Sequence, residues 1–120
     1  MDPRIQDFIS RIAHDLVGLD LALFFQADPG TFDTAAGLSL HLHHPAEEIQ
    51  HALDRLVAAE LLESTTRGEP AYQVYGLPGD PAVWNLLCDV AGAYLDSPDG
   101  RKEIVRMLVR QRVEDATHDE

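Results

Sequence analysis

The chain contains a single cysteine, Cys88, among its 120 residues. An intramolecular disulfide is therefore excluded, and a reducing compartment is indicated. Cys88 lies in an apolar helical stretch, so we interpret it as a small core residue. No run of about 18 apolar residues predicts a membrane-spanning helix, and the first residues lack the basic-then-apolar pattern of a signal peptide. We expect a cytoplasmic protein that does not contact a membrane.

Positive charge is also scarce. Lys and Arg number 9 against 21 Asp and Glu, which gives a formal net charge of −12. Because an acidic surface repels phosphate, this balance disfavours binding to nucleic acid unless a local basic patch dominates the contact. The length predicts one ordinary domain.

Catalytic motifs are missing as well. No serine lies in a G-x-S-x-G turn, and no glycine-rich loop has the spacing that holds a phosphate. Carboxylate pairs are frequent only because acids are frequent. We expect that the protein is not an enzyme and uses no cofactor.

Apolar residues spaced three and four apart predict helices along most of the chain. We expect the first helix to begin at Asp2–Pro3 and to be interrupted at Gly18, with a central core helix over 19–27. Further helices are predicted over 34–42, 45–61, 81–95 and 101–114. Strand-forming residues between 62 and 77 predict one β-hairpin with its turn at 67–70. The prediction is a mainly α domain over residues 1–114, followed by a polar tail, 115–120, that frays.

The middle of the chain resembles a known motif. The segments 49–53 and 59–63, with Leu56 between them, resemble the pattern by which winged-helix repressors leave their second motif helix and enter the wing. Arg67–Gly68 looks like the wing turn, Tyr72 like the apolar anchor of the return strand, and 19–31 like the preceding core helix and turn.

Over about residues 19–77 the chain is similar to bacterial repressors of the MarR and ArsR families. The resemblance implies a winged helix, a helix-turn-helix plus wing, with flanking N- and C-terminal helices. Because those families dimerise through the flanking helices, it also implies a homodimer. The chain departs from the pattern at His43 and His44, where a glycine and an apolar residue are usual, and at Pro45, where a small polar residue is usual.

If the family's DNA-binding mode applied, the contacts would come from Gln50, His51, Arg55 and Arg67. The predicted recognition helix and wing set two arginines against six acids: Glu47, Glu48, Asp54, Glu60, Glu63 and Glu69. Two arginines neutralise few phosphates. We therefore predict a dimeric protein-interaction domain, with a DNA-binding transcriptional regulator as the alternative.

Two surfaces are candidates for the protein contact. One is the apolar face of the first helix, and the other is the basic face of the last helix, whose cations lie four apart. The residues concerned are Ile5, Phe8 and Ile12 on the first helix, and Lys102, Arg106 and Arg110 on the last. A solvated helix face also explains the cations. A small-molecule cleft lined by Phe25, Trp84 and Tyr94 is a further alternative, which core packing also explains.

Histidines and acids crowd between His41 and His51. His44 and Glu48 lie four apart, as do Glu47 and His51, so either pair could bind a metal from one helix face. A structural zinc site needs four ligands, and no cysteine assists here. Exposed histidines in a turn are the simpler interpretation, so we expect no metal site; a pH response of the histidines is the third alternative.

Overall fold

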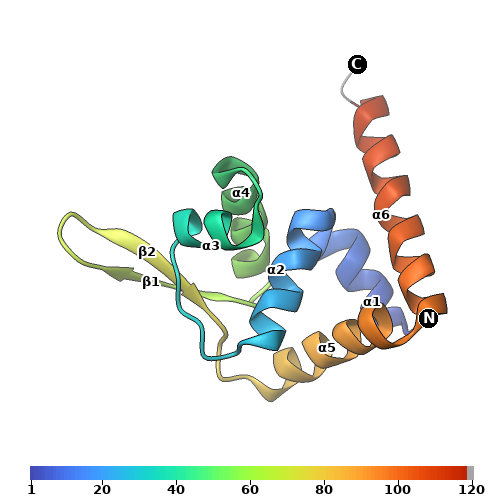
Figure 1. The fold of residues 1–120 in the computed structure, drawn as a ribbon, viewed down its shortest axis with the longest axis horizontal. Helices are drawn as coiled ribbons and strands as arrows, with labels where there is room; N and C mark the ends of the chain where they lie inside the picture. Colours follow the sequence, from blue (N-terminus) through green and yellow to red (C-terminus); the bar gives the residue numbers. More distant parts are fainter. Residues whose placement is uncertain (119–120) are drawn as a thin grey trace.

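A winged helix occupies the middle of the chain in the computed structural model, which describes residues 1–118 and the side chains of residues 1–115 (Figure 1). The expected mainly α fold with one β-hairpin and flanking helices is confirmed. The elements in chain order are α1 (Pro3–Asp7), η1 (Phe8–Ala13), α2 (Leu16–Ala27), α3 (Ala35–Leu42), α4 (Ala46–Ala58), β1 (Glu63–Arg67), β2 (Tyr72–Gly76), α5 (Pro81–Ala91), η2 (Gly92–Asp96) and α6 (Pro98–His118), where η marks wider π-helical turns.

The first helix starts as the sequence predicts and ends earlier than expected. The Asp2 carboxylate caps α1 by accepting from the Arg4 backbone N–H at 2.9 Å. The side-chain hydrogen bond from Arg4 lowers the pKa of Asp2 below its ordinary value. The helix then breaks at His14, whose φ is 65°, and not at Gly18, so that part of the prediction is wrong.

Gly18 lies inside the first turn of α2 instead. Asp15 is the N-cap of α2, and its carboxylate accepts from the Gly18 N–H at 2.9 Å. A Cβ on Gly18 would lie 2.2 Å from the Ala13 carbonyl oxygen. The glycine therefore permits the close approach of η1 and α2 and does not end a helix.

The helix-turn-helix forms from α3 and α4. Thr34 caps α3 by accepting from the Gly37 N–H at 3.1 Å, and His43 ends the helix in the left-handed conformation with φ 58°. Pro45 is the N-cap residue of α4. Leu38 of α3 and Ile49 and Leu53 of α4 are fully buried. Helix α3 packs on α4 and α4 packs on α2, which leaves the opposite face of α4 to solvent.

The hairpin pairs β1 with β2 antiparallel, from Glu63 opposite Gly76 to Arg67 opposite Tyr72. Asp33 pairs with Tyr75 through two backbone hydrogen bonds of 2.8 and 3.1 Å, which attaches the base of the wing to the start of α3. Tyr75 is buried, whereas Tyr72 is half exposed near the wing tip. The apolar anchor of the return strand is therefore Tyr75 and not Tyr72.

Helix α6 lies at the opposite end of the molecule from the wing, and α5 runs between the base of the wing and α6 (Figure 1). Asp80 caps α5, its carboxylate accepting from the Ala82 N–H at 2.9 Å. Ser97 accepts from the Gly100 N–H at 3.0 Å, so α6 begins three residues earlier than expected. It stays helical to His118, so residues 115–118 of the expected tail are helical, while 119–120 lie outside the described residues. None of the helices in residues 1–118 combines the length and apolar character that a bilayer crossing requires.

Candidate protein and nucleic-acid interfaces

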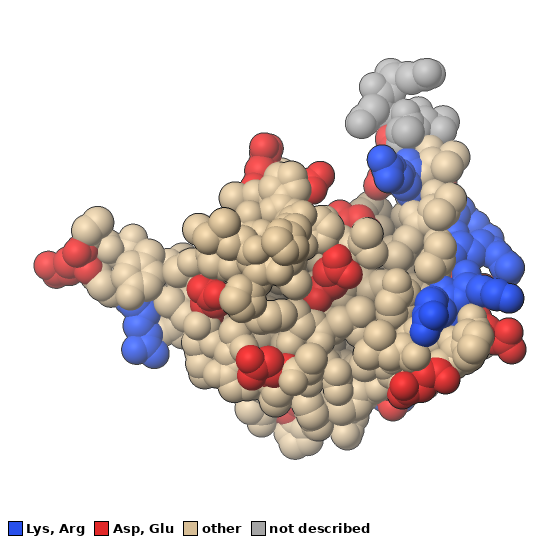
Figure 2. All heavy atoms as spheres, in the orientation of Figure 1, with Lys and Arg blue, Asp and Glu red and all other residues tan. Residues whose placement is uncertain are grey.

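The outward face of α4 is acidic. Glu47, Glu48 and Asp54 are exposed on it, together with His51. Figure 2 shows acidic side chains around the helix-turn-helix and at the tip of the wing. The part of the fold that would meet a DNA groove therefore carries mostly negative charge.

Arg55 does not belong to this outward face, contrary to the prediction. Its Nε donates to the Ile12 carbonyl at 3.2 Å, and its Nη2 donates to the Ala13 carbonyl at 3.0 Å and to the Asp15 carboxylate at 3.1 Å. A helix end leaves its last carbonyls to be satisfied from outside. Arg55 does this at the end of η1, so it fastens α4 to the joint between η1 and α2.

Gln50 is also committed within the domain. Its amide nitrogen donates to the Asp54 carboxylate at 2.9 Å and to the Tyr75 hydroxyl at 3.0 Å. This side chain sets α4 against the base of the wing. Of the four residues predicted to contact DNA, His51 and Arg67 are the two classed as exposed.

The wing adds little positive charge. Every residue of β1 is exposed, and Arg67 at its end is accompanied by the exposed Glu63 and Glu69. The Gln73 amide nitrogen donates to the Thr66 hydroxyl at 2.8 Å, which links the two strands on their exposed side. From Pro45 to Leu77 the arginines are Arg55 and Arg67, so one cation remains available to a partner on this surface.

The apolar stripe of the first helix is covered by the chain itself. Ile5 and Phe8 are 5% and 1% exposed, and Ile12 is partly buried against the same core. The covering elements are α2, α4, α5 and α6, which pack on α1 and η1. The prediction of an intermolecular apolar face at these residues is wrong, because α5 and α6 fold back over it.

The basic face of α6 is exposed as predicted. Lys102, Arg106 and Arg110 all point to solvent, and Arg106 has an exposed pairing with Glu103 at 3.0 Å. Figure 2 shows the Lys and Arg side chains gathered along this helix. Within the same helix Val105 and Val109 are 43% and 56% exposed, and their spacing of four places them on one face.

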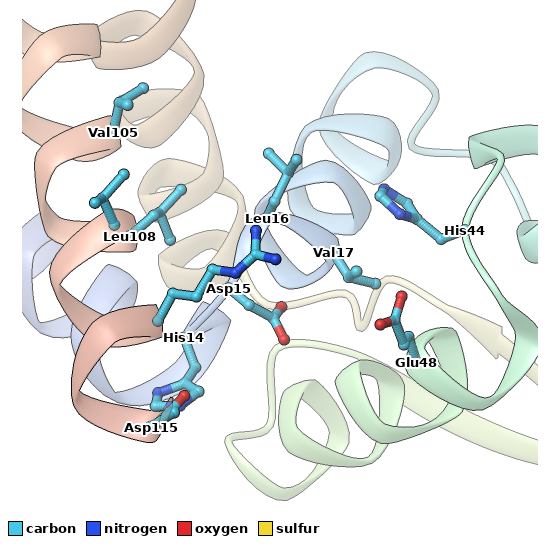
Figure 3. A pocket seen from close by; sticks show the side chains of 11 residues that line it. His14, Asp15, Leu16, Val17, His44, Glu48, Val105, Leu108 and Asp115 are labelled. Carbon is cyan, nitrogen blue, oxygen red and sulfur yellow. The ribbon is translucent and has the colours of Figure 1, made fainter. Parts of the chain in front are cut away.

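A groove of about 530 Å³ separates α6 from the start of α2 and the turn between α3 and α4. Figure 3 shows Val105 and Leu108 on one side, His44 and Glu48 on the other, and Leu16 between them. His14 Nε2 lies 2.9 Å from Asp115, and His44 Nε2 lies 2.7 Å from Asp20. The lining residues are His14, Asp15, Leu16, Val17, His44, Glu48, Val105, Leu108, Val109, Arg112 and Asp115. This groove is not predicted from the sequence, because its walls come from segments far apart in the chain.

The weaker candidates are not assembled into sites. Within the described residues no group of three or more His, Cys, Asp or Glu is arranged to hold a metal. His44 is paired with Asp20, Glu48 lines the groove, and His51 is exposed elsewhere on α4.

The predicted small-molecule cleft is not formed either. Trp84 lines a pocket that includes neither Phe25 nor Tyr94; its other lining residues are Pro29, Leu77, Pro78, Gly79, Asp80, Pro81 and Val83. Phe25 is 1% exposed within the core. Tyr94 lies beneath the Arg101 guanidinium at 5.7 Å.

No protein-family model matches the chain, and no curated protein sequence matches it. Among solved structures, the chain is similar to one described as "Possible transcriptional regulator from Methanosarcina mazei Go1". The TM-score is 0.57 at 14% sequence identity, and the match covers 82% of this chain and 86% of that chain. The likeness shows a shared fold over most of both chains.

Proposed function

We propose that the chain is a non-enzymatic, cytoplasmic winged-helix module that forms a homodimer and acts in transcription regulation by binding another protein. The observation that supports this most is the outward face of α4. It presents Glu47, Glu48 and Asp54, while its one arginine, Arg55, is bound to the joint between η1 and α2.

The charge of this face opposes DNA binding. Recognition helices contact base edges through their N-terminal residues, and here that turn carries Glu47 and Glu48. Sequence-independent affinity comes from neutralised phosphates, for which each protomer offers Arg67 on this side. Protein surfaces have no such requirement for positive charge, so the same face suits a protein partner better.

The second candidate is a DNA-binding regulator of the MarR or ArsR type. It is favoured by the order of α3, turn, α4 and wing, and by the shared fold with a protein described as a possible transcriptional regulator. In that function His51 and Arg67 would make the contacts, with Gln50 after release from its bonds to Asp54 and Tyr75.

The two candidates differ in their binding to random-sequence genomic DNA, measured by fluorescence anisotropy at about 50 and about 200 mM salt. A repressor with six or more phosphate contacts loses on the order of a thousandfold in affinity across that range. We expect no binding at either salt concentration. Tight binding with the steep salt dependence, weakened by Arg67→Ala, would instead establish the DNA-binding function.

A charge variant tests the stated cause. Glu47→Lys combined with Glu48→Lys should produce DNA binding at low salt that falls steeply with added salt, because the repulsion at the start of α4 is reversed. The matched control, Asp99→Lys with Glu114→Lys on α6, makes the same change of charge far from the wing. Equal gains in both variants would show that net charge, and not the α4 surface, limits binding.

A further inference from the structure

A second pocket, here called the Trp84 pocket, lies on the side of the domain away from α4. It forms where the turn between α2 and α3 meets the connection from β2 to α5 (Figure 1). Its volume is about 490 Å³, and its lining combines Trp84 with Pro29, Pro78 and Pro81. Because each proline ring fixes its backbone φ, much of this lining is rigid before anything binds.

Trp84 is not absorbed by the core. Its neighbours Val83 and Leu87, on the inner face of α5, are 7% and 3% exposed, whereas Trp84 is 38% exposed. Within the part of the chain that the structure describes, its indole N–H has no hydrogen-bond acceptor. Tryptophan is enriched where proteins bind partners, because one side chain supplies a large apolar surface and a hydrogen-bond donor. Trp84 therefore offers a partner both its ring and a free donor.

Phe32 extends the apolar surface beyond the pocket. It is 59% exposed, and its ring covers Gly76 at the end of β2, where an added Cβ would lie 2.4 Å from the ring. The next residue, Leu77, lines the Trp84 pocket. Two exposed aromatic side chains thus flank the same short connection between the wing and α5. Single exposed apolar residues are ordinary, but a group of them around a pocket indicates a binding surface.

Carboxylates border this surface. Asp80 lines the pocket, and Asp28 precedes the lining residue Pro29; both aspartates are exposed. Asp80 uses its Oδ1 to cap α5 at the Ala82 N–H, which leaves Oδ2 available. The side chain of Asp28 has no partner among the described residues. Both carboxylates can therefore accept hydrogen bonds from a ligand.

Cations are missing from the same region of the sequence. No Lys or Arg occurs at positions 12–54 or 68–100, and these two ranges contain every lining residue of the pocket. Arg4, which reaches α5 from α1, is bound there by Asp89. Arg101, which follows η2, is bound by two carbonyls of η2. The segments that form the pocket thus supply acids and no cation to balance them.

We propose that the Trp84 pocket and Phe32 bind an extended, arginine-containing segment of a partner protein. A guanidinium over the Trp84 indole gains a cation–π attraction, which is strongest with tryptophan, and its planar fork can donate to Asp80 and Asp28. The methylene stem of the arginine and its apolar neighbours pack on the prolines and on Phe32. This surface is separate from α4, so it extends the proposed function and does not depend on which of its two candidates is right.

Two other occupants fit less well. A proline-rich segment without cations would suit the aromatic and proline lining. It would also cover Asp28 and Asp80 without pairing them, and a buried carboxylate without a partner is costly. A second copy of the chain brings a net charge of −12 to a surface that is itself acidic. Charge therefore favours a cationic partner over both.

Trp84 is the single tryptophan of the chain, so its fluorescence reports on this pocket alone. The probe is a short synthetic peptide in which arginine alternates with proline, and its matched control has glutamine in place of every arginine. At about 50 mM salt, where charges are weakly screened, we expect the arginine peptide to shift the Trp84 emission saturably. The glutamine peptide should bind at least about tenfold more weakly. An equal response to both peptides, or no response to the arginine peptide, would overturn the cationic partner.

Variants locate the contact, with affinity measured by the anisotropy of the labelled arginine peptide. Trp84→Leu keeps an apolar side chain but loses the aromatic ring, and it should weaken binding about tenfold. Asp28→Asn combined with Asp80→Asn should also weaken binding about tenfold, because asparagine preserves the cap of α5 but removes the charge. Circular dichroism should stay unchanged in both variants.

The matched control is Glu63→Gln combined with Glu69→Gln, which removes two exposed charges from the wing and should leave the affinity unchanged. Equal losses in both double variants would show attraction by net charge and would rule out the Trp84 pocket as the site. A wild-type dimer that Trp84→Leu dissociates in sedimentation equilibrium would make a second copy the occupant. None of these results depends on the DNA measurement, so a failure here leaves the proposed function in place.

Discussion

We expect Arg55→Ala to lower the free energy of unfolding by about 2–3 kcal/mol. Hydrogen bonds to a charged group each contribute about 1.5–3 kcal/mol, and the three bonds of Arg55 together contribute less than their sum because this side chain is partly exposed. The guanidinium is bound by the carbonyls of Ile12 and Ala13 and by the Asp15 carboxylate. Urea denaturation followed by circular dichroism measures the loss.

Two further variants separate geometry from charge. Arg55→Lys keeps the charge but loses the planar fork that reaches three acceptors, so its stability should lie between alanine and wild type. Arg67→Ala removes an exposed arginine of the wing and should change stability by less than about 0.5 kcal/mol. If Arg55→Ala left stability unchanged and weakened DNA binding, Arg55 would be an outward DNA contact after all.

We expect Gly18→Ala to lower the free energy of unfolding by about 2–3 kcal/mol, which lies in the upper part of the range of about 1–3 kcal/mol that is typical of an overpacked core. The added Cβ would lie 2.2 Å from the Ala13 carbonyl oxygen, and the backbone of η1 must move to admit it. This loss outweighs the gain of about 1 kcal/mol that alanine brings to a helix. Thermal unfolding of the variant should show a clear fall in Tm.

Gly92→Ala provides the control for Gly18→Ala. A Cβ on Gly92 would meet no atom within 4 Å, and this residue begins η2. The variant should be neutral or more stable by up to about 1 kcal/mol. Equal destabilisation by both substitutions would contradict the steric argument.

Arg55 and Gly18 belong to one joint, which also sets the groove. Asp15 caps α2 through Gly18, binds Arg55 of α4, and lines the groove opposite α6. His14, at the break itself, is paired with Asp115 of α6. The joint therefore fixes the relative positions of α2, α4 and α6.

Local sequence patterns were sufficient to predict most of the helices, the hairpin and the helix-turn-helix motif. The start of the first helix is predicted from Asp2 and Pro3 before a helical apolar pattern, and the Asp2 carboxylate forms the capping hydrogen bond. Thr34 and Asp80 cap α3 and α5 in the same way, each at the start of a predicted helix. The hairpin follows from strand-forming residues on both sides of a turn. These features depend on neighbouring residues in the chain, so the sequence alone predicts them.

Long-range contacts decided the surfaces. Periodicity shows that Ile5 and Phe8 share an apolar face, but only the packing of α2, α4, α5 and α6 shows that the chain covers this face itself. Arg55 has the spacing of an outward residue, yet its guanidinium binds carbonyls more than forty positions away. The sequence by itself determined the winged helix, the scarcity of positive charge on its recognition side and the row of cations on one face of α6. The direction of Arg55, the burial of the first helix and the groove beside α6 were decided by the tertiary structure, because each depends on which distant segment satisfies a given side chain or carbonyl.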